Sequence, residues 1–118
     1  MARNPSPAPF LRMATEVTPT EIVVHCTGKL TSDTIQQLKA TVKPLFSESK
    51  TVVLDLTNVT YTDSSGLGAM VGLYISAKAA KGRLKLINLN QHLKEIFSIT
   101  RLGQAMAQGR DPEDLFPP

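Results

Sequence analysis

Residues 62–68 read T-D-S-S-G-L-G, which places two adjacent serines between an acid and two glycines. The segment follows the apolar run 51–56 and opens a stretch with helical spacing, so it stands where a helix begins. Hydroxyls at such a position can cap the helix, help to hold a phosphate, act as a nucleophile or accept a phosphoryl group. The motif therefore raises four kinds of chemistry.

Helix capping explains only part of this motif. Asp63 and Ser64 are both good N-caps, and one of them satisfies the first backbone N–H groups of the helix. Gly66 and Gly68 need another reason, because each glycine costs about 1 kcal/mol relative to alanine in a helix. One reason would be that Gly68, Gly72 and Ser76, which are spaced by four, pack closely on a sheet. The other would be that the first helical turn is kept free of large side chains so that another protein can approach it.

The alternatives that involve nucleotides or catalysis fit the sequence poorly. The glycine spacing is G-x-G-x-x-x-G, Asn88 stands where a dinucleotide site has its ribose-binding acid, and there is no Gly-Lys-Ser/Thr. The G-x-S-x-G elbow of serine hydrolases is absent, and neither His25 nor His92 has an evident carboxylate to orient it. No residues have metal-ligand spacing. We expect no enzyme, metal or cofactor, and keep a small nucleotide-binding protein as an alternative.

Phosphoryl acceptance fits the remaining features. The helix dipole and free amides favour an added anion at the first turn, so the fold tolerates it. The added charge, about −1.5 to −2, would fall beside Asp63 on a surface built for close approach. Modification would then switch binding off while the domain stays folded.

The composition is that of one soluble domain. The 118 residues are 42 % hydrophobic, and the formal net charge is only +3, with scattered cations and 5 % aromatic residues. We therefore expect no direct binding of nucleic acid. No apolar run approaches the ~20 residues of a membrane span, and the residues near Met1 show no secretory h-region, so we expect a cytoplasmic protein without membrane insertion. Residues 1–9 read as a flexible lead, residues 10–118 as the domain, and Cys26 as a buried, inert thiol.

Hydrophobic periodicity predicts alternating strands and helices, hence an α/β sandwich on a mixed sheet. The expected elements are strands 10–17 and 21–28, helix 31–46, strand 51–56 buried on both faces, helix 64–82, strand 83–89, helix 90–103 and a helix start at 111–116.

Local signals set the expected helix ends. Thr31 or Ser32 should cap the first helix, Pro44 should end or kink it, Gly82 should be the C-cap of the second, and Asn90 should cap the third. The expected apolar face of the second helix comprises Leu67, Val71, Tyr74, Ile75 and Lys78, and that of the third comprises Leu93, Ile96, Phe97 and Thr100.

Residues 52–102 resemble the STAS domain, in particular bacterial anti-sigma factor antagonists. The strand–Asp-Ser-Ser-Gly-Leu-Gly–helix junction is the specific part, and 28–38 and "LKEIFSITRL" are similar to the first and third helices of that family. The resemblance implies a STAS-like sandwich in which three to four helices cover a mixed sheet of four to five strands.

The resemblance also implies a signalling role. Family members bind an anti-sigma factor that is also a serine kinase with the histidine-kinase-like ATPase fold, and so free a sigma factor. Phosphorylation releases the antagonist, and a serine phosphatase restores it. The family's acceptor follows the Asp of the motif, which implies Ser64 here, with Ser65 as second candidate. The alternative is a non-switching STAS subunit of a lipid-transport or sensory complex.

The expected partner footprint combines the helix start with the preceding loop. Its residues are Thr31, Ser32, Asp33, Asp63, Ser65, Gly66, Leu67 and Gly68. The sequence departs from the family in that loop, because Lys29 and Thr31 replace an acid pair in a Gly-Glu-Leu-Asp run.

Overall fold

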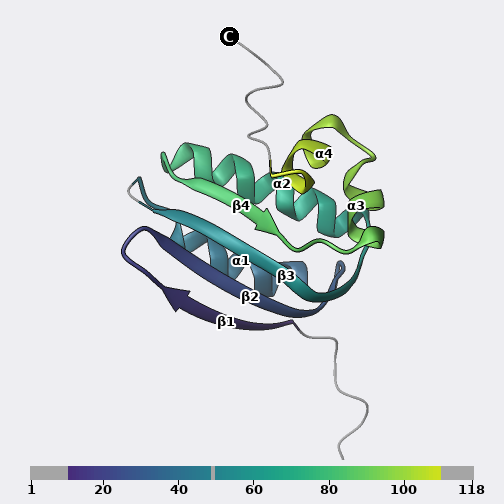
Figure 1. Cartoon of the computed structure of the whole chain (residues 1–118), viewed down its shortest axis with the longest axis horizontal. Helices are drawn as coiled ribbons and strands as arrows, with labels where there is room; N and C mark the ends of the chain where they lie inside the picture. The colour runs from purple at the N-terminus through teal and green to yellow at the C-terminus, as the bar shows by residue number, and fades with distance from the viewer. Residues whose placement is uncertain (1–10, 49, 110–118) are drawn as a thin grey trace, which may run out of the picture.

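A mixed sheet of four strands organises the protein, whose computed structural model describes residues 11–48 and 50–109 (Figure 1). The strands lie in chain order, and their bounds are β1 Arg12–Val17, β2 Glu21–Leu30, β3 Thr51–Thr62 and β4 Arg83–Ile87. β1 pairs antiparallel with β2, whereas β2, β3 and β4 run parallel. The expected mixed sheet is confirmed.

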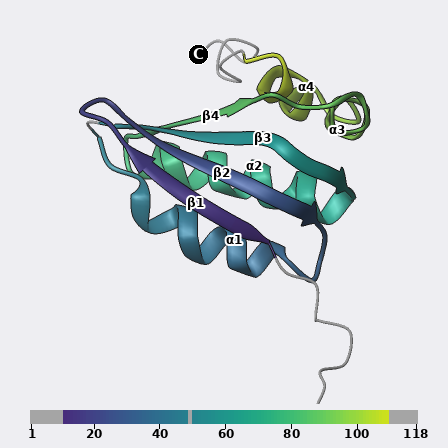
Figure 2. The same cartoon turned by 60° about the horizontal axis from the view of Figure 1, so that its bottom comes forward.

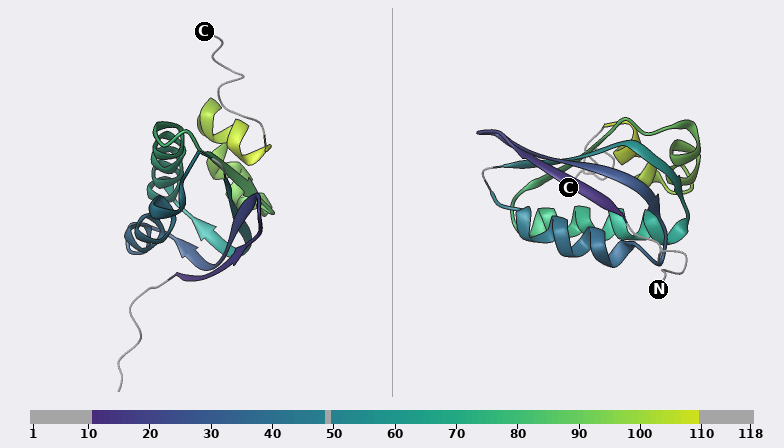
Figure 3. Two further views of the ribbon diagram at one scale, coloured as in Figure 1. Left: turned by 90° about the vertical axis from the view of Figure 1, so that its left-hand side faces the viewer. Right: turned by 90° about the horizontal axis from the view of Figure 1, so that it is seen from below.

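The helices of the described residues are α1 Ile35–Val42, α2 Ser64–Ala79, α3 Gln91–Phe97 and α4 Arg101–Ala107, with a 3-10 turn at Lys43–Leu45 after α1. The first two helices connect the parallel strands, α1 between β2 and β3 and α2 between β3 and β4, whereas α3 and α4 follow β4. α1 and α2 lie side by side on one face of the sheet, α4 lies near β4, and α3 lies beyond the end of β4, where it contacts β3 (Figures 2 and 3). The carboxyl ends of β2 and β3 therefore share one end of the sheet, where α2 begins (Figure 2).

The core lies between the sheet and the pair α1 and α2. Alternate residues of β2, such as Val24 and Cys26, are buried beneath these helices. Burial raises the pKa of Cys26 to about 12, which agrees with the expected inert thiol. On β3 the prediction of burial on both faces holds for Val53 but not for Asp55, which is only half-buried.

Two strands are longer than the sequence predicts. β2 continues past Gly28, which adopts φ 131°, to Leu30, with irregular pairing on either side of that glycine. β3 runs on from the expected 51–56 to Thr62, because residues 57–62 keep pairing with the end of β2. This extension carries the strand directly into the Asp-Ser-Ser-Gly junction.

The start of α1 and the end of α2 correct two expected caps. α1 begins at Ile35 after Thr34, so the prediction of Thr31 or Ser32 as cap is wrong. At the end of α2, Lys81 takes the left-handed conformation (φ 60°), and the N–H of Gly82 donates to Ala77 O at 2.8 Å. Lys81, and not Gly82, thus holds the position at which a Schellman motif favours glycine.

Later elements depart from the sequence pattern in similar ways. β4 stops at Ile87, because Asn88 turns to φ 63°. The predicted helix 90–103 is two helices: Asn90 caps α3 as expected, but Thr100 caps α4 through its hydroxyl instead of lying on an apolar face. On α2, Ile75 is 60 % exposed, so the buried stripe is displaced toward Met70, Leu73 and Ala77. The lead 1–9 and the helix start 111–116 lie outside the described residues.

Candidate functional site

The junction between β3 and α2 settles which side chain is the cap. Asp63 is extended (φ −123°, ψ −170°), and its Oδ1 accepts the N–H groups of Ser65 at 2.9 Å and Gly66 at 3.2 Å. Ser64 is the first residue of α2 and is exposed, whereas Ser65 is half-buried. Among the described residues the Ser64 hydroxyl makes no hydrogen bond. The helix therefore does not need that hydroxyl as a cap.

The Leu30 carbonyl holds this junction against the end of β2. It accepts the Thr62 hydroxyl at 3.0 Å and the Asp63 N–H at 3.3 Å. A Cβ on Gly66 would overlap Thr62 Oγ1 and lie 2.9 Å from the Leu30 oxygen. Gly66 thus allows the first turn of α2 to sit directly on the ends of the two strands.

Gly68 has the opposite environment. A Cβ on Gly68, or on Gly72 one turn later, would meet no atom within 4 Å. The interpretation of these glycines as a stripe that packs on the sheet is therefore wrong. Gly68 is exposed and leaves a bare patch beside Ser64 on the outer side of α2.

Gly66 and Leu67 face inward. Leu67 is only 6 % exposed, and a Cβ on Gly103 of α4 would lie 2.8 Å from Leu67 Cδ1. The expectation that both residues contribute accessible surface to a partner footprint is contradicted by their burial. Their role in the structure is to pack the start of α2 against the sheet and α4.

The loop that precedes α1 lies next to the same helix start. Residues 31–33 follow Leu30, whose carbonyl binds Asp63 N–H, so the loop and the junction leave the sheet side by side. Thr31 is half-buried, whereas Ser32 and Asp33 are exposed. The structure therefore brings together the two segments that the sequence predicted as one surface.

Thr34 fixes the shape of this loop. Its hydroxyl donates to Lys29 O at 2.7 Å and accepts the Thr31 N–H at 3.0 Å, and the residue is 1 % exposed. Because the hydroxyl is used in the loop, it does not cap α1. Sequence reasoning missed this residue, although a threonine next to a helix start is a type that commonly hydrogen-bonds to nearby backbone groups.

His92 supports the other flank of the junction. Its ring stacks on Tyr61 with centroids 4.9 Å apart, and Nε2 lies 3.2 Å from Thr62 N and 3.0 Å from Thr62 O. Tyr61 remains 42 % exposed. An exposed aromatic ring thus stands two residues before the Asp-Ser-Ser motif.

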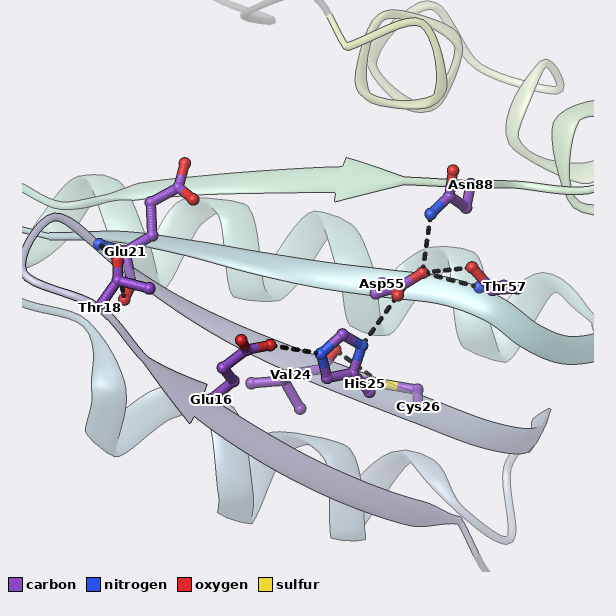
Figure 4. A network of polar contacts seen from close by, with 9 residues as sticks. All are labelled: Glu16, Thr18, Glu21, Val24, His25, Cys26, Asp55, Thr57 and Asn88. Carbon is purple, nitrogen blue, oxygen red and sulfur yellow. Dashed lines mark hydrogen bonds and ion pairs between the residues drawn. The ribbon is translucent and has the colours of Figure 1, made fainter.

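A second polar cluster lies away from the junction, on the face of the sheet opposite α1 and α2 (Figure 4). His25 Nδ1 is 2.8 Å from Asp55 Oδ2, and Nε2 is 3.0 Å from Glu16 Oε1. The prediction that His25 lacks a carboxylate orienter is wrong, because pairing of β1, β2 and β3 brings distant residues together. Both carboxylates raise the pKa of His25, that of Glu16 more strongly.

The carboxylate of Asp55 accepts hydrogen bonds from several residues. Its Oδ1 accepts the Thr57 hydroxyl at 2.6 Å, the Thr57 N–H at 3.1 Å and the Asn88 amide at 3.0 Å. Burial alone would raise the pKa of Asp55, but hydrogen bonds from Thr57, Asn88 and His25 outweigh it and hold that pKa well below its usual range. Since both nitrogens of His25 face carboxylates and not a hydroxyl, this cluster is not arranged for nucleophilic catalysis.

The described residues also limit other kinds of site. Within residues 11–48 and 50–109, no group of three or more His, Cys, Asp or Glu could hold a metal ion. None of the described helices is long and apolar enough to cross a membrane.

Comparison with known proteins identifies the family. The family described as "Mlab, STAS domain" matches residues 13–108, which is most of the chain. This chain belongs to the STAS domain family. The match spans β1 to α4 apart from one residue at the start of β1, and therefore includes the junction, the loop and the His25 cluster.

Relatives of this STAS domain carry regulatory names. It is 34 % identical over 82 residues to the anti-sigma-B factor antagonist of Bacillus subtilis, covering 70 % of this chain and 75 % of the relative. It is 32 % identical over 83 residues to the protein of that name from Listeria monocytogenes, covering 69 % and 72 %.

Solved structures show the same fold. The unphosphorylated anti-sigma factor antagonist SpoIIAA superposes with a TM-score of 0.68 at 22 % identity, covering 88 % of this chain and 92 % of that one. The phosphorylated form of SpoIIAA, from Bacillus, gives 0.63 at 23 % identity, covering 88 % and 96 %. The STAS fold implied by the sequence is confirmed.

Proposed function

We propose that this STAS domain is an anti-sigma factor antagonist that binds an anti-sigma factor serine kinase, and that phosphorylation of Ser64 switches this binding off. The carrying observation is the division of labour at the start of α2. Asp63 caps the helix, so the exposed Ser64 hydroxyl is left available for chemistry. Ser65 remains the second candidate, and its half-buried position makes it the less accessible hydroxyl.

The local charges explain how a phosphate would act. The sequence alone suggested that free N–H groups of the first turn would bind a phosphate on Ser64. In the structure the N–H groups of Ser65 and Gly66 already donate to Asp63, so they are not free to enclose that phosphate. The added charge of about −1.5 to −2 would therefore stay at the surface, beside the Asp63 carboxylate. The helix dipole tolerates it, while a partner seated on this surface would be repelled.

The proposed footprint surrounds Ser64. It combines the exposed loop residues Ser32 and Asp33, the bare patch at Gly68 and the rims of the junction formed by Thr31, Asp63 and Ser65. Gly66 and Leu67 support this surface from beneath. The loop carries Lys29 where the family has an acid, so we expect the partner kinase to match a less acidic loop.

The proposal gives the domain a regulatory and not a catalytic role. An unphosphorylated domain would hold the kinase and so free a sigma factor in the cytoplasm, and a serine phosphatase would restore the binding form. The names of the relatives, which are antagonists of anti-sigma factors, support this role.

Phosphorylation can be tested directly. The full chain is incubated with ATP, Mg²⁺ and each serine kinase of the histidine-kinase-like class from the same genome, and intact mass and peptide mapping locate the phosphate. We expect one phosphate on Ser64, lost in Ser64→Ala and kept in Ser65→Ala. Phosphate only on Ser65, or only on Ser6 outside the described residues, would overturn the assignment.

A second candidate function follows from the family name. The matching description "Mlab, STAS domain" favours a non-switching subunit, for instance of a lipid-transport complex. Affinity purification of the tagged chain from its own cells separates the two. Recovery of a transporter ATPase, with no kinase and no phosphate on the chain, would favour the subunit.

A further inference from the structure

β1 is an outer strand of the sheet. It pairs with β2 on one side, and among the described residues no strand pairs with its other side. Figures 1 and 3 show β1 at the rim of the sheet opposite β4. An unpaired edge is a template for another strand, and natural proteins usually protect it.

The hairpin fixes which backbone groups point outward. Thr18 N–H donates to Glu21 O at 2.8 Å, so alternate residues back along β1 are the ones bonded to β2. The outward backbone groups of β1 therefore belong to Met13, Thr15 and Val17. Beyond the strand, Leu11 N–H is already used, because it donates to Gln37 Oε1 of α1 at 2.7 Å.

The charges of β1 are complementary to those of a second copy of the strand that runs antiparallel to it. Residues 12–16 read R-M-A-T-E, with a cation and an anion placed symmetrically about Ala14. Two such strands, antiparallel about a two-fold axis at Ala14, would pair Arg12 with Glu16 twice. The outward groups of Met13 and Thr15 would form the hydrogen-bonded pairs between them, so the backbone pattern allows this register.

We propose that β1 is a self-association surface that binds β1 of a second copy of this chain in that register. Ala14 meets Ala14 in a non-hydrogen-bonded pair, the closer of the two pair types, where a small side chain fits. Val17, 64 % exposed in one copy, lies opposite Leu11 of the other and extends the apolar layer above α1. One oxygen of Glu16 faces His25, which leaves the second for Arg12 of the partner.

The charges select this register over its neighbours. Pairing centred on residue 12 or 16 opposes like charges, which destabilises a cross-strand pair. Pairing centred on Met13 or Thr15 places neither Arg12 nor Glu16 opposite a charged residue of the second strand. Because a contact of one strand edge is small, we expect a weak dimer. It leaves Ser64 accessible, because that residue follows β3, two strands away, so the inference does not depend on the proposed function.

Sedimentation velocity of the full chain from about 10 μM to 1 mM, at low salt, tests the association itself. We expect a concentration-dependent dimer that weakens at least about tenfold in Arg12→Glu and in Glu16→Arg. The double exchange R12E/E16R should restore the dimer, because the two ion pairs between the copies form again with their charges exchanged. Lys85→Glu, the same charge change on the opposite edge strand, is the matched control, and circular dichroism checks that each variant folds.

Cross-linking tests the register. Ala14→Cys should form a disulfide-linked dimer under mild oxidation, because only residue 14 lies on the two-fold axis at a distance suited to a disulfide. Thr15→Cys should cross-link far more slowly, and the buried Cys26 should not react. A chain that stays monomeric throughout, a dimer indifferent to the charge exchanges, or preferred cross-linking through residue 15 would each overturn the proposal.

Discussion

The two polar clusters of this STAS domain, the His25 cluster and the β3–α2 junction, differ in how fully their side chains are hydrogen-bonded within the molecule. At the His25 cluster both ring nitrogens meet carboxylates, and Asp55 is further bound by Thr57 and Asn88. At the β3–α2 junction the cap is also complete, but the Ser64 hydroxyl beside it points to solvent. The first cluster joins β1, β2 and β3, and the second ends at the surface.

This difference separates structural from functional polarity. Hydrogen bonds within the molecule account for the side chains of the His25 cluster, whereas the exposed hydroxyl of Ser64 is accessible to another molecule. The rigidity of the junction comes from residues that the footprint does not include, namely Leu30, Thr62 and Gly66. The junction therefore combines a fixed support with an exposed hydroxyl.

The largest effect on stability should come from Gly66, the buried glycine of the junction. Gly66→Ala places a Cβ against Thr62 Oγ1 and the Leu30 carbonyl, which cannot both withdraw, so we expect a loss of about 2–3 kcal/mol in unfolding free energy. Gly68→Ala is the matched control, and it should be neutral or raise stability by up to about 1 kcal/mol. Urea unfolding measures both. Equal losses in the two variants would erase the distinction between the buried and exposed glycines.

Gly68→Gln should separate binding from stability. The longer side chain extends from the outer side of α2 into the space proposed for the partner, so kinase affinity should fall at least about tenfold. The helix should be unharmed or up to about 1 kcal/mol more stable. Calorimetric titration and thermal melting measure the pair. Unchanged affinity would move the footprint away from this patch.

The two members of the cap motif should respond differently. Asp63→Ala removes the acceptor of two backbone N–H groups and should cost about 1 kcal/mol. Ser64→Ala should change stability by less than about 0.5 kcal/mol, because alanine is a good helix former and the cap is elsewhere. Chemical unfolding of both variants provides the comparison. A larger loss in Ser64→Ala would make that hydroxyl structural.

The smallest effect should be the pH dependence of the His25 cluster. The folded state raises the pKa of His25, so its contribution to stability is complete below the unfolded pKa of about 6.5 and is lost as pH rises through the folded value. Wild type should therefore lose stability between about pH 6 and pH 9 relative to His25→Gln, which has no titrating group there. Parallel unfolding profiles for the two proteins would mean that the ion pairs contribute nothing.

Local patterns revealed much of this architecture in advance. Periodicity located the strands and helices, and Asn90, Asp63 and the glycines marked the junctions, because these signals depend only on neighbours in the chain. The exposed position of Ser64 was part of the same local pattern. The break at Ser98 was missed, because the apolar spacing continues through Thr100 while the hydroxyl of that residue starts a new helix.

Features that depend on strand register were out of reach. Glu16, His25 and Asp55 are far apart in sequence, and only the pairing of three strands brings them together. Gly66 and Gly68 look alike in sequence, yet one faces Leu30 and the other faces solvent. At the end of α2 the sequence predicted Gly82 as the C-cap, but Lys81 is the residue that takes the left-handed conformation. Tertiary context can therefore also override a turn preference.

A comparison of two forms of the wild-type chain gives the sharpest test of the proposed phosphorylation switch. The protein is phosphorylated by its kinase, purified, and titrated into nucleotide-loaded kinase beside the unmodified protein, with melting curves of both. We expect phosphate on Ser64 to reduce affinity at least about a hundredfold while the melting temperature hardly moves, because the charge lies on the surface and the cap is Asp63. Equal affinity of the two forms, or a phosphorylated chain that no longer folds, would rule out the proposed switch.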